Sequence, residues 1–257
     1  MTDFNQNGSS PWGAASVPLT QAAYDQGLRT YMLGIYNHMT LALGISGLVA
    51  WGVNMATAVM VNGKLVGLTP FGQMLYASPL KWLVMLAPLA FVMVLSFRFE
   101  RMSYTGLLGT FWAFAATMGL SLSSILIVYT HSSVLHVFAI ASLMFAGTSL
   151  YGYTTKKSLS AFGGFLVMGL IGLMIASIVN IFMQSSAFQF AISVLGVLIF
   201  AGLTAWDTQR LKEDYDSIAY EQSLIAKYSV MGALTLYLDF INMFQFLLSL
   251  LGQRNND

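Results

Sequence analysis

The chain of 257 residues contains no cysteine and very few charged residues. Without cysteine it forms no disulfide bonds and carries out no thiol chemistry. Charged residues make up 8% of the sequence, whereas a soluble domain has about 25%. The formal net charge of +1 excludes the strongly basic face of a nucleic-acid-binding protein. Hydrophobic residues reach 57%, so the composition indicates an integral membrane protein.

Apolar runs long enough to cross a bilayer follow one another along the chain. The first is predicted from Tyr31 to about Val53 and the second from about Leu80 to Phe97. Residues 102–155 contain no Lys, Arg, Asp or Glu, and this run is too long for one helix of about 20 residues but right for two. The charge-free residues 158–206 divide in the same way, and Leu234–Leu251 is the last run. We therefore predict an all-α membrane protein, a seven-transmembrane-helix bundle.

The segments outside these runs are short and polar. Residues 1–30 include Pro11 and Pro18 and have little apolar surface to bury, so we predict a flexible polar tail. The transmembrane domain is then 31–252, followed by a short C-terminal tail, 253–257. Within the domain, the hydrophilic stretch Asp207–Lys227 is predicted to separate the sixth and seventh spans.

Positive charges are divided unevenly between the two ends of the predicted bundle. Eight Lys and Arg residues fall on the N-terminal side and three on the other side. Because cytoplasmic loops carry an excess of Lys and Arg, we predict a cytoplasmic N-terminus and an external C-terminal tail. The eight are Arg29, Arg98, Arg101, Lys156, Lys157, Arg210, Lys212 and Lys227, and the three are Lys64, Lys81 and Arg254.

The last apolar run, LTLYLDFINMFQFLLSLL, contains Asp239. An ionised carboxylate facing lipid would cost on the order of several kcal/mol, so Asp239 must face protein or water. Thr235, Asp239, Asn242 and Ser249 are spaced so that they share one helical face. The spacing predicts a central seventh helix with Asp239 as a functional residue.

A second carboxyl group, Asp207, closes the sixth span. If the sixth and seventh helices run antiparallel, Asp207 and Asp239 meet near one end of the bundle. Two close carboxylates in a medium of low dielectric cannot both be ionised cheaply, so they would share a proton and titrate as a pair. The alternative for Asp207 is a helix-end carboxylate that reaches the interface beside Arg210. Arg98, at the end of the second span, either stops that helix or reaches inward to the carboxylates.

With these residues in place, the chain resembles the Bax inhibitor-1, or transmembrane Bax inhibitor motif, family in its bacterial form. The resemblance covers roughly residues 28–252 and is carried by ALTLYLDFINMFQFLLSLLG, AWDTQR and YGYTTKKSLSAFGGFLVMGLIGL. It implies a seven-helix bundle with a central seventh helix and a di-aspartyl pair tied to pH-dependent calcium leak. Asp207 and Asp239 stand at the two positions of that pair, and Arg98 stands where an arginine is proposed to latch it. Some members carry a glutamate in the second span, where this chain has LVMLAPLAFVMVLSF.

The expected function is a pH-sensitive calcium or cation leak channel in the bacterial inner membrane, with Asp207, Asp239 and Arg98 as its pH-sensing and ion-pathway residues. The two aspartates are also the candidate Ca²⁺ contacts, since carboxylate oxygens suit this hard cation. No cofactor and no enzymatic activity are expected. The alternative is a non-conducting regulatory protein that binds a membrane protease or another membrane partner, as bacterial relatives are thought to do.

Two other classes of membrane protein do not fit the residues. An intramembrane aspartyl protease also needs two aspartates on adjacent helices, but the G-x-G-D context is missing around Asp239. A retinal protein needs a lysine in the seventh span for the Schiff base, and Leu234–Leu251 has none. These two absences leave the leak channel and the regulatory protein as the competing hypotheses.

Overall fold

The computed structural model describes residues 20–61 and 64–255, and seven of its helices are long and apolar enough to cross a membrane. These are α1 (Gln21–Thr57), α3 (Leu80–Arg98), α4 (Tyr104–Leu122), α6 (His131–Thr154), α7 (Ser160–Met183), α8 (Ser186–Ile218) and α9 (Gln222–Leu251). The 3-10 turn η1 (Phe99–Arg101) extends α3, and the short helix α5 (Ile125–Val128) follows α4. The prediction of an all-α seven-helix membrane bundle is confirmed.

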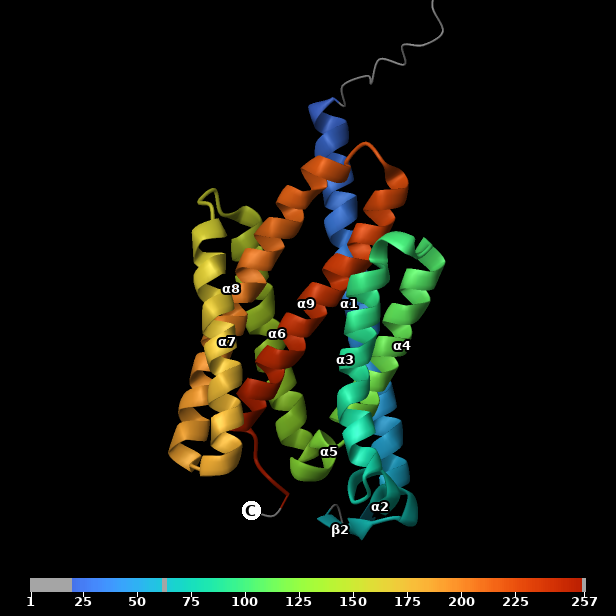
Figure 1. The fold of residues 1–257 in the computed structure, drawn as a ribbon, viewed down its shortest axis with the longest axis vertical. Helices are drawn as coiled ribbons and strands as arrows, with labels where there is room; N and C mark the ends of the chain where they lie inside the picture. The colour runs from blue at the N-terminus through green and yellow to red at the C-terminus, as the bar shows by residue number, and fades with distance from the viewer. Residues whose placement is uncertain (1–19, 62–63, 256–257) are drawn as a thin grey trace, which may run out of the picture.

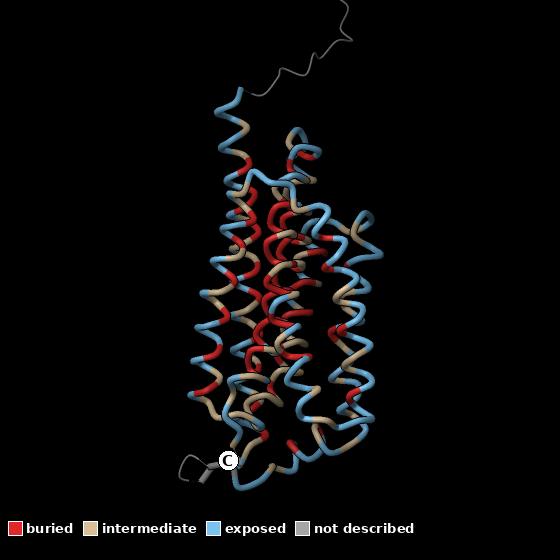
Figure 2. Tube along the Cα trace, turned by 90° about the vertical axis from the view of Figure 1, so that its left-hand side faces the viewer, coloured by how far each residue is buried: buried red, intermediate tan, exposed pale blue. Residues whose placement is uncertain are grey.

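Helix α9 is the centre of the bundle. It packs against α1, α4, α6 and α8, and buried positions are concentrated along the middle of the bundle (Figure 2). Its largest fully buried side chains include Tyr237, Leu236 and Met243. Apolar surface elsewhere in the bundle is widely exposed, as a protein surrounded by lipid requires. The predicted central seventh helix is therefore present.

The connections between helices lie at the two ends of the bundle, and with seven spans the chain starts and finishes at opposite ends (Figure 1). One end holds the start of α1, the α3–α4 and α6–α7 connections and the α8–α9 turn. The opposite end holds α2, α5, the α7–α8 turn and the last described residues of the chain. The eight positive residues counted above thus belong to loops or helix ends at one end of the bundle, although its cytoplasmic location stays a prediction.

Helix α1 begins earlier than the apolar pattern indicates. Residues 21–30, which we expected to belong to the flexible tail, are helical, and most of the remainder of that predicted tail, 1–19, lies outside the described residues. The rings of Tyr24 and Tyr31 pack on Tyr215 of α8, with centroids 5.4 and 5.5 Å away. Gly27 lies directly beneath the Tyr215 side chain, where a Cβ would collide with the ring hydroxyl. These contacts hold the extra turns against α8.

The hydrophilic stretch predicted between the sixth and seventh spans is mostly helical as well. Helix α8 continues to Ile218 and α9 already begins at Gln222, so only a short turn separates them. Leu211, Tyr215 and Ile218 are buried, and their spacing of four and three residues forms one apolar helical face. This face packs inward while most of the charged residues between them remain outside, which explains why the helix continues.

A small cap that the sequence did not predict closes the other end of α1. Strands β1 (Ala58–Val61) and β2 (Lys64–Leu68) pair antiparallel, and helix α2 (Pro70–Tyr76) follows. Thr69 starts α2 by accepting a hydrogen bond from Gly72 N at 3.1 Å. Gly72 also lies against the Thr57 carbonyl, where a Cβ would not fit. The hairpin and α2 are thereby fixed to the end of α1.

The described part of the C-terminal tail is anchored at the same end of the bundle. Gln253 N donates to Ser133 Oγ at 2.9 Å, and Gln253 O accepts from Thr130 N at 2.9 Å. Asn255 N donates to Val128 O, also at 2.9 Å. The tail therefore joins the end of α9 to the turn between α5 and α6.

Candidate functional site

The structure brings two of the three predicted site residues together. Asp207 lies on α8 and Asp239 on α9, and their carboxyl groups are within hydrogen-bonding reach of each other. The side chains are only 7% and 5% exposed. Because α8 extends well past Asp207 and α9 begins well before Asp239, the pair lies several turns inside the bundle. It is farther from the connecting turn than the sequence indicated.

A shared proton is what this arrangement requires. Ionised carboxylates offer only hydrogen-bond acceptors, and Asp239 Oδ2 is buried with no hydrogen-bond partner among the described residues. Two negative charges at this depth would be costly, because burial in low dielectric disfavours each charge and the charges repel. One proton held between Asp207 and Asp239 removes a charge and supplies the missing donor. The two groups then titrate as a pair.

Small residues set the close helix packing around the pair. Gly152 of α6 lies against the carbonyl of Ala205 in α8, where a Cβ would collide with the backbone. Gly232 of α9 faces Ile35 and Leu211, whose side-chain atoms would come within 2.9 Å of an added Cβ. Close approach at glycine is the usual device of helix packing in membranes. It holds α8 and α9 between α6 and α1 with both aspartates inside.

Hydroxyl groups on three helices form a chain beside Asp207. The Tyr36 hydroxyl of α1 is 2.7 Å from Ser149 Oγ of α6, and Ser149 Oγ is 3.0 Å from Thr208 Oγ1 of α8. Elsewhere in the bundle, Tyr237 OH lies 2.7 Å from Ser46 Oγ. Sequence reasoning missed both sets, because each pairs residues far apart in the chain whose helix neighbours it could not assign. Only Ser46 had a local signal, a position between two glycines of the first span.

The third predicted site residue, Arg98, does not reach the pair. It is exposed at the end of α3, a helix that packs chiefly against α4 rather than α8. The predicted contact with the two carboxyl groups is absent from the described residues of this structure. The cation that acts electrostatically on Asp207 is Arg210, three residues on in α8, and its guanidinium lies 5.6 Å from the Trp206 ring centroid. The sequence had offered Arg210 as the alternative neighbour of Asp207.

The pair is not equipped to hold a resident metal ion. Across the residues that the structure describes, no three His, Asp or Glu side chains gather into a group that could bind one. Ca²⁺ takes about six to eight oxygen ligands, and a pair of carboxyl groups supplies fewer than that. Asp207 and Asp239 therefore suit brief contact with a passing cation, whose other oxygens are water or backbone carbonyls, rather than permanent binding.

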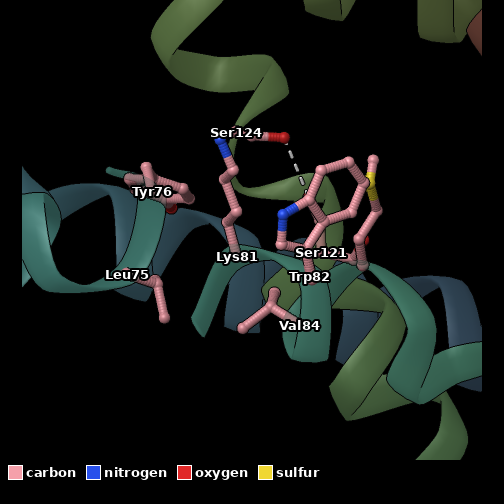
Figure 3. Close-up of a pocket in the computed structure, with 8 residues that line it drawn as sticks. Leu75, Tyr76, Lys81, Trp82, Val84, Ser121 and Ser124 are labelled. Atoms are coloured by element: carbon pink, nitrogen blue, oxygen red, sulfur yellow. Dashed lines mark hydrogen bonds between the residues drawn. The ribbon is translucent and has the colours of Figure 1, made fainter. Parts of the chain in front are cut away.

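A separate cavity of about 360 Å³ lies where α2, the start of α3 and the end of α4 meet (Figure 3). Lys81 and Trp82 line it, with the Lys81 ammonium group 5.6 Å from the Trp82 ring centroid. Tyr76 OH is 2.6 Å from Ser123 Oγ nearby. Lysine and aromatic side chains at a helix end are typical of the membrane–water interface. The residues that line this cavity include no carboxylate, so it is not the candidate cation site.

Comparison with known proteins decides the family. The family model described as "Inhibitor of apoptosis-promoting Bax1" matches residues 28–256. The chain belongs to this Bax1-inhibitor family. The resemblance found in the sequence is thus confirmed, and it extends over almost the whole chain.

Bacterial members of the Bax1-inhibitor family are similar to this chain over nearly their full lengths. An uncharacterized protein of Caulobacter vibrioides is 42% identical over 98% of this chain and 98% of its own length. The inner membrane protein YbhL of Escherichia coli is 42% identical, covering 89% of this chain and 93% of its own length. Protein RP147 of Rickettsia prowazekii is 41% identical, covering 91% and 93%. With its seven spans, this member of the family is a multi-span integral membrane protein.

Proposed function

We propose that the protein lets Ca²⁺ or another cation leak across the bacterial inner membrane under the control of pH. The observation that carries the proposal is the pair of buried carboxyl groups, Asp207 and Asp239, from the two most buried spans. Intramembrane carboxylates are costly and mark ion or proton pathways by default. The inner-membrane location is supported by the name of the similar protein YbhL, and the cytoplasmic N-terminus by the uneven division of positive charges.

The pH control follows from the three protonation states of the pair. With one shared proton, the pair carries one negative charge and is bound together by its own hydrogen bond, which holds α8 to α9. Loss of that proton leaves two negative charges that repel across the α8–α9 interface. Gain of a second proton removes the charge that attracts Arg210. We propose that the singly protonated state closes the pathway and that both other states loosen it.

Flux measurement in purified proteoliposomes tests this proposal. Vesicles containing the wild-type protein and an internal Ca²⁺ indicator should take up Ca²⁺ at a rate that changes with pH, whereas protein-free vesicles should not. The same assay with K⁺ and Mg²⁺ separates a calcium pathway from a general cation leak. Wild-type vesicles that show no cation flux at any pH would defeat the leak channel. The non-conducting regulator of a membrane protease or other membrane partner would then be favoured.

A further inference from the structure

A long groove opens between α1 and α6, away from the aspartate pair. It is a cavity of about 1060 Å³, and α9 forms its floor with Phe240, Ile241 and Phe244. Its rims carry Leu48 and Leu135, which are 71% and 70% exposed. Since both helices are membrane spans, the groove faces the bilayer, and it needs an apolar occupant.

Two glycines on α1 make the groove deep. Gly44 and Gly47 line it, and a Cβ added to either would meet no atom within 4 Å. Other glycines in this bundle mark close helix contacts, as at Gly152 and Gly232. Gly44 and Gly47 have no such contact among the described residues, so the space they leave is available to something outside the chain.

One end of the groove is polar. His131 lines it there, and its Nε2 lies 3.4 Å from Asn54 Oδ1. Asn54 is only 4% exposed, yet its Nδ2 has no hydrogen-bond acceptor in the described part of the chain. A buried amide donor without a partner is costly. Trp51, a residue type typical of the membrane interface, lines the same end.

We propose that this groove binds one membrane phospholipid, with an acyl chain along α1 and α6 and the polar head at His131 and Asn54. The groove runs along α1 from Tyr36 to Trp51, which is roughly 22 Å at about 1.5 Å per residue. One leaflet contributes about 15 Å of hydrocarbon, so the groove is long enough for a chain that enters from one side. A phosphate or ester oxygen supplies the acceptor that the Asn54 amide lacks.

A transmembrane helix fits the groove less well. Close packing of a helix in a membrane relies on small residues along the contact. The glycines that line this groove all lie on its α1 wall, whereas α6 and α9 present Phe138, Phe240 and Phe244. An apolar helix would also leave the Asn54 amide without an acceptor. A lipid satisfies both the irregular apolar wall and the polar end.

Native mass spectrometry of the purified protein in non-ionic detergent tests this binding, with palmitoyl-oleoyl phosphatidylglycerol as the added lipid. The wild type should retain one lipid molecule, and the Gly44→Leu/Gly47→Leu variant, whose leucines fill the groove, should retain at least about tenfold less. Gly172→Leu is the matched control, because Gly172 also has open space around it but lies on α7. Equal lipid retention in the groove-filled variant and the wild type would overturn the proposal.

Two further arms identify the occupant. A diacylglycerol with the same chains should bind the wild type roughly tenfold more weakly than the phospholipid, because it lacks the charged acceptor. That preference should disappear in His131→Phe. Because the chain has no cysteine, Gly44→Cys gives a single reactive site. Efficient disulfide dimers of Gly44→Cys in native membranes would show that a second copy fills the groove and would reject the lipid.

Discussion

The carboxyl groups of Asp207 in α8 and Asp239 in α9 lie within hydrogen-bonding reach of each other in the interior of the bundle. Since neither ionised group donates a hydrogen bond, a proton must be present for the two to bind each other. The α8–α9 interface is thereby linked to pH. The hydroxyl chain beside the pair is neutral, so the pair is the natural place for pH to change the packing of these helices.

Arg210 should tune the pH response and Arg98 should not. Arg210 acts electrostatically on Asp207, and its removal makes ionisation of the pair less favourable. In Arg210→Gln, the pH at which flux changes through loss of the shared proton should move upward. Arg210 is exposed, so we expect a shift below about one pH unit that shrinks at high salt.

Arg98→Gln is the matched control for that measurement, since Arg98 is also exposed but lies at the end of α3. Its pH profile should coincide with that of the wild type. A leaky or shifted Arg98→Gln protein with an unchanged Arg210→Gln profile would restore the latch predicted from the sequence and reject the assignment of Arg210.

Substitutions at the Tyr237–Ser46 hydrogen bond should have unequal costs. Ser46 Oγ also approaches the carbonyls of Ala42 and Ala115, at 3.0 and 2.7 Å. Ser46 therefore donates to a carbonyl, and Tyr237 donates to Ser46. Ser46→Ala leaves the buried Tyr237 hydroxyl without an acceptor and should cost about 1–3 kcal/mol, whereas Tyr237→Phe should cost about 1 kcal/mol.

Thermal unfolding of the detergent-solubilised protein measures this difference. The double variant Ser46→Ala/Tyr237→Phe removes both partners and should be more stable than Ser46→Ala alone. Strictly additive losses in the double variant would contradict the assigned direction of this hydrogen bond.

Gly152 should be intolerant of even one added methyl group. A Cβ at this position collides with the Ala205 backbone carbonyl of α8, so Gly152→Ala must push α6 away from α8. We expect a loss of about 1–3 kcal/mol in stability. Gly147 is the control, because it lies on the same helix and an added Cβ there would meet no atom within 4 Å. Gly147→Ala should be neutral or slightly stabilising, and similar melting temperatures for the two variants would show that this helix contact is not tight.

The two ends of the bundle should report opposite sides of the membrane. A reporter inserted in the turn between Ile218 and Gln222 should behave as cytoplasmic, and one fused after Asp257 as external. The structure places the α8–α9 turn and the last described residues at opposite ends (Figure 1). Reporters on the same side of the membrane would contradict the seven-span topology, and exchanged sides would contradict only the predicted orientation.

The spans could be predicted because hydropathy over about 20 residues is a property of the segment itself. The meeting of Asp207 and Asp239 was also predictable, because antiparallel neighbours bring the end of one span beside the start of the next. The continuation of α8 through its charged residues was not, since the stabilising contacts are made by Tyr215 with Tyr24 and Tyr31 of α1. The spacing of Leu211, Tyr215 and Ile218 was the available signal for that extension.

The contacts of the predicted site with other helices were harder to predict. A long arginine side chain at a helix end can reach in several directions, and only the packing of α3 against α4 shows that Arg98 lies away from α8. The hydroxyl chain of Tyr36, Ser149 and Thr208 depends likewise on which helices are neighbours. A single sequence does not contain this information, because hydropathy places each span in the membrane without stating what lies beside it.

The most direct test of the account is the pH dependence of Ca²⁺ flux in proteoliposomes that contain the wild type, Asp207→Asn, Asp239→Asn or the double variant. Asparagine keeps the shape of aspartate but neither ionises nor shares a proton. We predict a pH-dependent flux in the wild type and a flattened profile in each single variant. Because coupled groups titrate together, the double variant should lose little more of the pH response than either single variant. Additive changes in the pH midpoint, or a wild-type profile retained in either single variant, would contradict the claim that Asp207 and Asp239 act as one switch.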